Sequence, residues 1–300
     1  MKKYSKKNIL ITGGLGFIGS NLARSLVNLG ANVSLVDNLN SENGGNLFNI
    51  QDISDQVTLK ICDIRDTSEM LNLIKGKDYL FNLAGQTSHI DSMKNPQLDL
   101  DINTIAQLDL LELCRKENPQ IKIVFASTRQ IYGKPDYLPV DEKHHVRPVD
   151  VNGINKSAGE RYHLLYNNLY GIRSCALRLT NTYGPGMRVR DSRQTFIGIW
   201  IRFLIEGKPI KVFGDGLQIR DFNYVDDCVE AFLLAGASNK ANGKVFNLGS
   251  KEVICLNDLA KMMVNLGKGG EIELVPFPKD RSAIDIGDYF SDFTLITDEL

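Results

Sequence analysis

The sequence predicts an α/β protein that combines a doubly wound parallel sheet with a smaller C-terminal domain. Short apolar strands alternate with amphipathic helices through residues 1–179, a glycine-rich turn joins the first strand to the first helix, and the alternation loosens from Thr180 onward. A chain of alternating strands and helices forms a parallel sheet, because each helix crosses over to the next strand. We therefore expect one domain over 1–179 and another over 180–300, with part of 210–235 returning to the first.

Residues 9–37 (ILITGGLGFIGSNLARSLVNLGANVSLVD) form a strand, a glycine turn, an amphipathic helix and a second strand that ends in an acid. Gly13, Gly14 and Gly16 let the turn approach a pyrophosphate closely, and Gly19 lets the helix pack near the strand. The phosphates would meet a helix N-terminus, whose free N–H groups and dipole attract anions. These features predict a dinucleotide site of the Rossmann type.

The acid at the end of the second strand is Asp37, and it indicates which dinucleotide binds. Its carboxylate can accept hydrogen bonds from the ribose hydroxyls and would repel a 2′-phosphate, so we expect NAD rather than NADP.

The later elements continue the alternation. Ligands bind outside the carboxyl ends of such strands, so we expect Gly85, Ser127 and Thr180 to face one crevice. Further strands are expected at 57–66, 78–85, 121–127 and 172–179, and helices at 68–76, 98–118, 155–171 (stopped by Gly171) and near 195–206.

Composition narrows the class of partner. A formal net charge of −1 gives no field that would attract nucleic acid or an anionic membrane. No run of about twenty apolar residues could span a bilayer, and we read the lysines at 2–7 as a solvated N-terminal tail. The five cysteines have no paired or metal-ligand spacing, which favours reduced thiols and a cytoplasmic protein. No metal site is expected, and most of the four histidines should have solvent or ordinary hydrogen-bond partners; they are His89, His144, His145 and His163.

Seven motifs occur in order at suitable spacing, and together they resemble the extended short-chain dehydrogenase/reductase family in its nucleotide-sugar epimerase and dehydratase branch (UDP-glucose 4-epimerase-like). The resemblance covers nearly the whole chain. It implies that 1–179 binds NAD and that 180–300 binds a nucleotide-diphosphate sugar. The motifs are TGGLGFIGS, VDNL, CDIRD, NLAG, FASTRQIYG, LRLTNTYGPG and GDGLQIRDFNYVDD.

By family position, the resemblance also implies a set of cofactor contacts beyond the glycines and Asp37. They are Phe17, Ile18, Asn38, Asp63, Ile64, Leu83, Ala84, Gly85, Asn103 and Lys156.

In that family a tyrosine, assisted by a lysine and a serine or threonine, removes the sugar hydroxyl proton while hydride passes to NAD. Lys156 matches the lysine and Thr128 the hydroxyl residue, but the tyrosine position falls on Asn152. A carboxamide does not titrate near neutral pH, so Asn152 cannot serve as the usual acid or base.

Three interpretations of Asn152 remain open at the level of sequence. Another group could supply the proton path, namely Tyr132, Tyr162, His144, His145 or Lys156 acting through water. Asn152 could instead only bind a hydroxyl, in a protein that has lost redox turnover. The assignment could also be wrong by one helical turn, which fits NGINKSAGE least well.

The residues after Thr128 bear on the reaction. Dehydratases of this branch usually have acids there, whereas this chain has Arg129 and Gln130, and neither can protonate a leaving hydroxyl. This favours epimerisation, with C4 inverted through a transient 4-keto intermediate. Net 4-oxidation, ketone reduction, dehydration and a catalytically impaired binding protein are the alternatives.

For the substrate, the resemblance implies that Asn181, Arg220 and Arg281 contact the diphosphate, because guanidinium groups donate paired hydrogen bonds to phosphate oxygens. Phe213 could pack beside the nucleotide base or lie in the core. The basic stretch at 187–193 could close over the substrate or be a solvated loop.

The resemblance further implies a homodimer, in which the helices at 98–118 and 153–170 pair across a four-helix bundle. Candidate contacts are Leu108, Leu111, Tyr162 and Leu165, although these side chains could equally face their own sheet.

Overall fold

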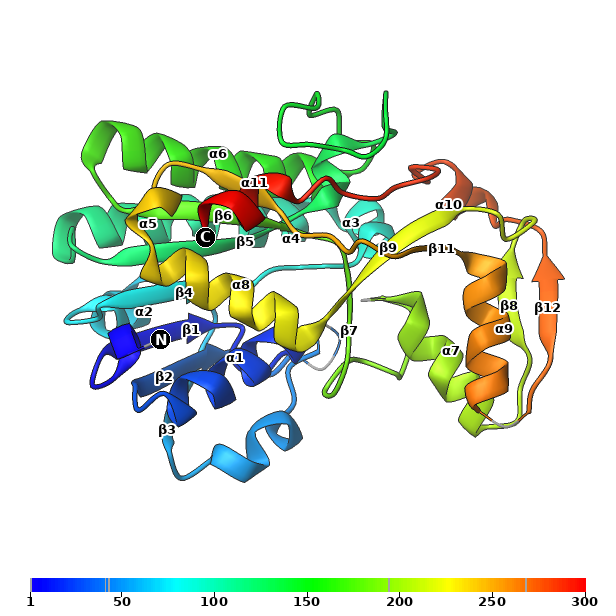
Figure 1. The fold of residues 1–300 in the computed structure, drawn as a ribbon. Helices are drawn as coiled ribbons and strands as arrows, with labels where there is room; N and C mark the ends of the chain where they lie inside the picture. The colour runs from blue at the N-terminus through cyan, green and yellow to red at the C-terminus, as the bar shows by residue number, and fades with distance from the viewer. Residues whose placement is uncertain (1, 41, 43, 194, 268) are drawn as a thin grey trace.

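A seven-stranded parallel sheet lies at the centre of the computed structural model, which describes residues 2–40, 42, 44–193, 195–267 and 269–300 (Figure 1). The strand order is β10-β6-β5-β4-β1-β2-β3, so the order reverses between β1 and β4. This topology confirms the predicted doubly wound, Rossmann-type α/β class. The strands are β1 (Asn8–Thr12), β2 (Asn32–Asp37), β3 (Val57–Ile61), β4 (Tyr79–Asn82), β5 (Lys122–Thr128), β6 (Ser174–Leu179) and β10 (Val245–Asn247).

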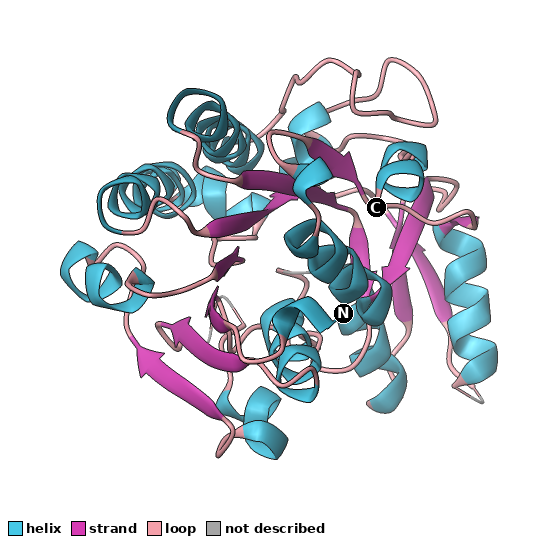
Figure 2. Ribbon diagram, turned by 60° about the vertical axis from the view of Figure 1, so that its left-hand side comes forward, coloured by secondary structure: helices cyan, strands magenta, loops and turns pink. Residues whose placement is uncertain are grey.

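Helices cover both faces of this sheet (Figure 2). On one face, Leu22 of α1 and Phe232 of α8 are fully buried in one apolar core. On the other, Met70 of α2 and Leu110 of α5 are buried in a second core, which Tyr166 of α6 joins. The helices are α1 (Phe17–Asn28), α2 (Thr67–Ile74), α5 (Ala106–Glu117), α6 (Val151–Tyr170) and α8 (Val225–Ala237), with short turns at η1 (Lys2–Tyr4), η2 (Leu47–Ile53), η4 (Arg129–Tyr132) and η5 (Asn239–Ala241).

The ends of α6 follow from its flanking residues. Asp150 caps the N-terminus, where its Oδ1 accepts a 2.6 Å hydrogen bond from the Gly153 N–H. Gly171 follows the last turn in the left-handed conformation (φ +69°), which glycine adopts without a Cβ penalty, as predicted.

The segment predicted as one helix over 98–118 is divided in the structure. It consists of α4 (Pro96–Leu100), a π-helical turn η3 (Asp101–Ile105) and α5, and α3 (His89–Lys94) precedes it. The side chain of Gln107 donates a 3.0 Å hydrogen bond through Nε2 to the Ile102 carbonyl, which lies in the π-helical turn. Periodicity alone cannot show such a turn, because it extends the helix by one residue without breaking it.

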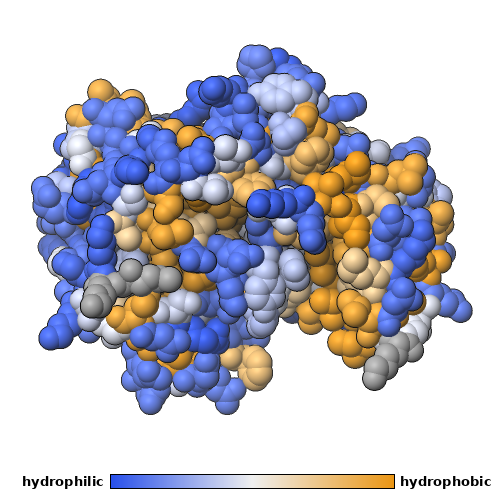
Figure 3. All heavy atoms as spheres, viewed as in Figure 1, coloured by the Kyte–Doolittle hydropathy of each residue, from blue (hydrophilic) through white to orange (hydrophobic). Residues whose placement is uncertain are grey.

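A smaller lobe is built mostly from residues after β6, on the right of Figure 1. Trp200, Ile210, Val212 and Ala260 form its buried core. Figure 3 shows that apolar side chains also gather on its surface. Its elements are a sheet of β7 (Asn181–Tyr183), β9 (Ile219–Tyr224) and β11 (Val253–Cys255), a parallel pair of β8 (Ile210–Phe213) and β12 (Ile272–Val275), and α7 (Phe196–Ile205), α9 (Leu256–Leu266) and α10 (Lys279–Ser282).

Between these lobe elements the chain returns to the main sheet through α8 and β10, and α11 (Thr294–Glu299) packs beside β10. The two lobes are therefore interleaved along the chain. A division into two domains at 179/180 remains a prediction.

The N-terminal segment is not the solvated tail that the sequence suggested. Tyr4 is fully buried and its hydroxyl donates to the Leu233 carbonyl at 2.6 Å, while Lys7 pairs with Asp78 at 2.8 Å. The aromatic ring between the lysines thus anchors this end of the chain against α8.

All five cysteines are free thiols. None of the helices in the part of the chain that the structure describes is long and apolar enough to cross a bilayer.

Candidate active site

A cavity of about 480 Å³ opens between the carboxyl ends of the main sheet and the smaller lobe. It is the crevice predicted outside the carboxyl ends of the strands, and it lies where the strand order reverses. Gly85, Ser127 and Thr180 all line it. So do, of the predicted site residues, Gly13, Gly16, Phe17, Ile18, Gly19, Asp37, Asn38, Asp63, Ile64, Leu83, Ala84, Thr128, Asn152, Lys156, Asn181, Phe213, Arg220 and Arg281.

At one end of the cavity the glycine turn meets the start of α1. A Cβ on Gly19 would lie 2.2 Å from the Gly13 carbonyl oxygen, so only glycine permits this approach of helix to turn. No side chain caps α1 at Gly16, and its first N–H groups are therefore available to an anion.

The acids at this end are held by backbone and side-chain donors. Asp37 accepts from the N–H groups of Leu15 at 3.1 Å and Leu39 at 3.0 Å, and burial raises the pKa of its carboxyl. Asp63 is paired with Arg65, which holds the pKa of Asp63 down to about 2, and it also accepts from the Asn38 amide at 2.9 Å.

Lys156 lies in the middle of the cavity, buried against the Phe125 ring, with its Nζ 5.0 Å from the ring centre. The ammonium donates to the Ala126 carbonyl at 3.2 Å. Burial lowers the pKa of Lys156 to about 8, and the opposing attraction of Asp99 is smaller.

Asn103 lies behind Gly85 rather than in the cavity wall. Its amide donates to the Gln86 carbonyl at 3.0 Å, whereas its buried Oδ1 has no hydrogen-bond partner among the described residues. A Cβ on Gly85 would lie 2.6 Å from Lys156 Nζ and 2.8 Å from Asn103 Oδ1. An unpaired acceptor and an ammonium thus flank a gap that only glycine leaves open, and this cradle suits a hydroxylated, anionic cofactor such as a dinucleotide.

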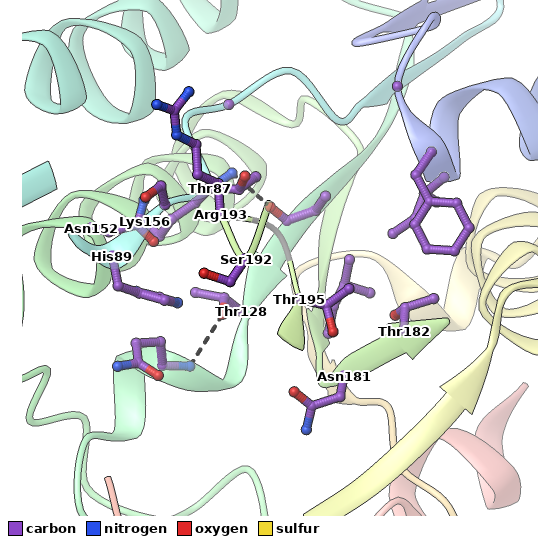
Figure 4. A pocket seen from close by; sticks show the side chains of 18 of the residues that line it. Thr87, His89, Thr128, Asn152, Lys156, Asn181, Thr182, Ser192, Arg193 and Thr195 are labelled. Atoms are coloured by element: carbon purple, nitrogen blue, oxygen red, sulfur yellow. Dashed lines mark hydrogen bonds between the residues drawn. The ribbon is translucent and has the colours of Figure 1, made fainter. Parts of the chain in front are cut away.

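Asn152 occupies the cavity wall beside Lys156 (Figure 4). Its Nδ2 donates to the Gln86 carbonyl at 2.8 Å, to Gln86 Oε1 at 3.3 Å and to Asp99 Oδ2 at 3.0 Å. These three acceptors use both amide hydrogens, so Asn152 can only accept a hydrogen bond from a ligand.

Four of the predicted alternatives for the proton path lie outside the residues that line the cavity. Tyr132 is fully buried, where its hydroxyl donates to Asn247 at 2.7 Å and accepts from Arg178 at 2.6 Å. Tyr162 packs against the core of the main sheet, His144 accepts from the Asp136 N–H, and the His145 side chain is 73% exposed.

His89 has a neighbour that the sequence did not reveal. His89 lines the cavity, and its Nδ1 lies 2.9 Å from the buried carboxylate of Asp150. The pairing was missed because the two residues are far apart in sequence. The signal that could have found it is the position of His89 just after Gly85, at the carboxyl end of β4.

Arginines gather at the other end of the cavity. Arg220 is 7% exposed, and its Nη1 donates to the carbonyls of Ile219 at 2.8 Å and Gly287 at 2.5 Å. Burial and the nearby Arg129 lower the pKa of Arg220 to about 10. Arg220 Nη2 lies 3.7 Å from Asp285 Oδ1, but the attraction of nearby acids is smaller than the effects of burial and of Arg129, so the two cations favour an anionic ligand.

Arg129 is a second residue whose role the sequence did not reveal. Its guanidinium stacks on Tyr289 with 4.9 Å to the ring centre, and Nη2 donates to Asn181 Oδ1 at 3.3 Å. Nη1 is buried without a hydrogen-bond partner in the described structure, and burial lowers the pKa of the group. This unpaired donor lies in the wall of the cavity, next in the chain to Thr128.

A pair of contacting phenylalanine rings borders the arginines. Phe213 lies with its ring centre 5.6 Å from that of Phe277, and Arg281 covers the Phe213 ring at 5.3 Å. Phe213 therefore belongs to the cavity wall rather than to the core of the lobe, and Arg281 Nη2 also donates to Ser192 at 2.8 Å.

The basic stretch at 187–193 is a paired loop at the cavity mouth. Arg193 forms ion pairs with Glu42 and Asp91, both at 3.2 Å, and Arg188 pairs with Asp191 at 2.6 Å. Ser192 and Arg193 line the cavity, so the loop joins the two lobes beside it (Figure 4). Elsewhere in the described chain, as here, no three His, Cys, Asp or Glu side chains are placed to hold a metal ion.

A glycine turn with an acid on the next strand, a buried lysine and an arginine-rich far end define a dinucleotide-dependent protein with a second anionic ligand. The sequence profile of the NAD dependent epimerase/dehydratase family matches residues 9–249, and the chain belongs to that family.

Curated relatives agree with this assignment. A protein of Methanocaldococcus jannaschii that carries the provisional name UDP-glucose 4-epimerase is 38% identical over 84% of this chain and 79% of its own length. UDP-glucose 4-epimerase of Mycolicibacterium smegmatis is 33% identical over 80% of this chain and 76% of its own.

Solved structures also agree. The UDP-glucose 4-epimerase of Thermotoga maritima, solved with UDP-glucose, superposes with a TM-score of 0.87 at 30% identity, over 97% of this chain and 91% of that one. The UDP-glucose 4-epimerase of Thermus thermophilus, solved with NAD, gives 0.86 at 27% identity over 97% and 92%.

Proposed function

We propose that this protein is an NAD-dependent epimerase that inverts one ring hydroxyl of a nucleotide-diphosphate sugar, at C4. The observation that carries the proposal is the continuous cavity, which joins the glycine turn at one end to the arginine and phenylalanine side chains at the other. Lys156 and Thr128 lie between the two ends, where a cofactor and a sugar would meet. The names of the two curated relatives described above support the same reaction.

In this proposal the cofactor lies on the glycine turn. The N-terminus of α1 holds the pyrophosphate, Asp37 accepts from the adenosine ribose, and Lys156 donates to the nicotinamide ribose. NAD supplies hydride chemistry, removing hydrogen from the sugar carbon and giving it back to the opposite face.

The substrate takes the other end. Arg220, Arg281 and Asn181 donate to the diphosphate, because buried guanidinium groups bind paired phosphate oxygens with little reorganisation. The base packs against the pair of rings formed by Phe213 and Phe277, which contact each other and leave no space between them for a base. The unpaired Nη1 of Arg129 lies near the sugar or its first phosphate and adds a further donor for an anionic group.

The side chains after Thr128 disfavour dehydration. Arg129 stays charged, and the Gln130 amide is engaged with Asp150 Oδ2 at 3.0 Å. Neither side chain can give a proton to a leaving hydroxyl, whereas epimerisation requires no leaving group.

The test is a panel of UDP-, dTDP-, GDP- and CDP-sugars incubated with the purified protein and NAD. Products are followed by mass spectrometry and proton NMR, with a C4-deuterated copy of any sugar that reacts. Equal-mass stereoisomers that keep deuterium at C4 support the proposal.

Three results would overturn it. Loss of water would mean dehydration, loss of two hydrogens would mean a net dehydrogenase, and binding without conversion would mean a protein that has lost turnover. Loss of the label to solvent would exclude return of the same hydride.

We also propose a homodimer formed by the outer faces of α5 and α6. Leu165 and Leu169 of α6 are 45% and 64% exposed, which leaves an apolar face available. Of the two alternatives for the candidate contacts, Leu111 takes the second: it is fully buried in its own core, and Leu108 and Tyr162 also pack there. Sedimentation of the wild type and of Leu169→Glu checks the proposal, and a monomeric wild type would contradict it.

Cytoplasmic residence is likewise proposed, since five free thiols suit a reducing compartment. A localisation tag that reports an oxidising compartment would contradict it.

A further inference from the structure

The proposed reaction requires a group that takes the hydroxyl proton, and Asn152 cannot do so. Its amide hydrogens are both engaged with Gln86 and Asp99, so the free carbonyl oxygen can orient a hydroxyl but not remove its proton. Tyr132 is equally unsuited, because it is sealed between Arg178 and Asn247. Some other group in the cavity must exchange the proton if turnover occurs.

His89 is in the right place for this exchange. It begins α3, directly after the loop that leaves β4, and of the described residues that line the cavity it is the one histidine. Its side chain is 35% exposed, and Figure 4 shows the ring and the Thr128 side chain pointing into the same space. The backbone ties it to Asn152, since Ser92 Oγ donates to the His89 carbonyl at 2.7 Å and accepts from the Asn152 N–H at 3.2 Å.

A buried carboxylate lies behind the ring. Nδ1 of His89 is 2.9 Å from Asp150 Oδ2, an ion-pair distance, so the carboxylate attracts a proton on Nδ1 by its charge rather than through an aligned hydrogen bond. The Asp150 side chain is fully buried. Burial alone would raise the pKa of Asp150, but His89, the Gly153 N–H and the Gln130 amide together hold that pKa below its usual value. The carboxylate therefore stays ionised and can stabilise a positive imidazolium.

The same carboxylate connects the ring to the other side of the site. Gln130 donates to Asp150 Oδ2 at 3.0 Å, and the Gln130 N–H donates to Thr128 Oγ1 at 3.2 Å. Thr128 and His89 are thus held from opposite sides by one short chain of contacts, which fixes the hydroxyl and the imidazole relative to each other.

We infer that His89 replaces the missing tyrosine as the catalytic acid and base, and that Asp150 is its positioning residue. The inference rests on the proposed epimerase function. In the first half-reaction, the O–H bond of the sugar breaks and its proton passes to Nε2 of His89, the C–H bond breaks as hydride leaves to NAD, and a carbonyl forms. In the second half, hydride returns to the carbon and the imidazolium gives its proton back to the oxygen.

The test compares His89→Gln and His89→Ala with His145→Ala, which changes an exposed histidine outside the cavity. We expect both His89 variants to melt near the wild type, to bind the nucleotide sugar with similar affinity, and to lose about 10²–10⁴-fold in kcat with little change in KM. Free imidazole should restore part of the kcat of His89→Ala, in proportion to its concentration, and should not affect His89→Gln.

Asp150→Asn separates charge from structure. Asparagine caps helices as well as aspartate, so this variant should keep α6 while removing the negative charge. We expect a lower kcat. In ¹⁵N-histidine NMR spectra of the protein without sugar, we expect the His89 ring to change from a proton held on Nδ1 to a mixture of both tautomers.

The outcomes are distinct. A wild type that converts no nucleotide sugar defeats the proposed function and this inference together. An active wild type whose His89→Gln variant keeps its kcat, or an active His89→Ala variant that imidazole does not stimulate, overturns the role of His89 alone. An Asp150→Asn spectrum identical to the wild type removes Asp150 as the positioning residue.

Discussion

Gly85→Ala tests whether the position of Lys156 determines activity. The new Cβ would lie 2.6 Å from Nζ and 3.2 Å from Cε of Lys156, whereas ordinary contacts begin near 3.4 Å, so Nζ must retreat by about 0.8 Å. It would also lie 2.8 Å from Asn103 Oδ1, which must move as well. The chain end can move, but it leaves its 3.2 Å hydrogen bond to the Ala126 carbonyl. Misplacement of a reacting group by about 1 Å costs about 100-fold in rate, which corresponds to about 2.7 kcal/mol of transition-state stabilisation.

The assay combines thermal melts, NAD titration and initial rates with a reactive nucleotide sugar. We expect kcat/KM to fall about 100-fold while the melting temperature changes little, because Gly85 is not in a left-handed conformation and alanine reduces the entropy of the unfolded chain. Gly267→Ala is the matched control. The atom nearest to its new Cβ would be the Met263 carbonyl oxygen at 3.2 Å, and Gly267 does not line the cavity.

A double variant makes the reasoning falsifiable. If Gly85 acts only through Lys156, then Gly85→Ala should add nothing to the loss caused by Lys156→Met. Wild-type kcat/KM in Gly85→Ala, or fully additive losses in the double variant, would refute the argument.

Three further predictions follow from buried charges. With a pKa of about 8 when folded and 10.5 when unfolded, Lys156 opposes folding below pH 8, and this penalty is relieved as pH rises from 8 to 10.5 because the unfolded chain then binds more protons. Over that range the melting temperature of the wild type should rise relative to that of Lys156→Met. Activity should fall above pH 8. Melting temperatures of the two proteins that change in parallel with pH would disprove the lowered pKa of Lys156. Arg178 Nη2 lies 2.6 Å from Glu160 Oε1, and Glu160→Gln removes this buried counter-ion. We expect the free energy of unfolding to fall by about 3–5 kcal/mol and the melting temperature to fall by about 5–8 °C. The exposed Glu230→Gln is the control and should change neither. Asp37→Ala removes the acceptor for the adenosine ribose hydroxyls and the charge that would repel a 2′-phosphate. Calorimetry should show the ratio of the NAD and NADP affinities falling by about tenfold or more. An unchanged ratio would contradict the role of Asp37 in selecting NAD.

The cofactor end of the site was predictable because its signals are local. The glycine turn, the uncapped start of α1 and Asp37 lie within one strand–helix–strand unit, and a parallel sheet must bring the ends of such strands to one edge. Gly171 was recognisable as a helix end for the same reason, since its left-handed conformation is a property of one residue.

The rest depended on contacts between distant segments. The pairing of His89 with Asp150 joins the start of α3 to the start of α6. The position of Arg129 depends on its contacts with Tyr289 and Asn181. Spacing along the chain carries no information about such pairs. The buried Tyr4 could not be predicted for the same reason. The lysine-rich composition of its segment indicates a solvated tail, whereas the Tyr4 hydroxyl donates to Leu233 of α8, which is distant in sequence.

The π-helical turn η3 has a consequence for how the two sides of this segment are oriented. One extra residue rotates everything before it by about 100° relative to everything after it. Asp99 can therefore turn toward Asn152 and Asn155 while Leu110 and Leu111 keep facing the sheet. Deleting one residue between 101 and 105 would make the helix continuous and rotate the Asp99 carboxylate away from its two amide partners. Asn152 would then lose a hydrogen bond that fixes its position, although every side chain that reacts would still be present.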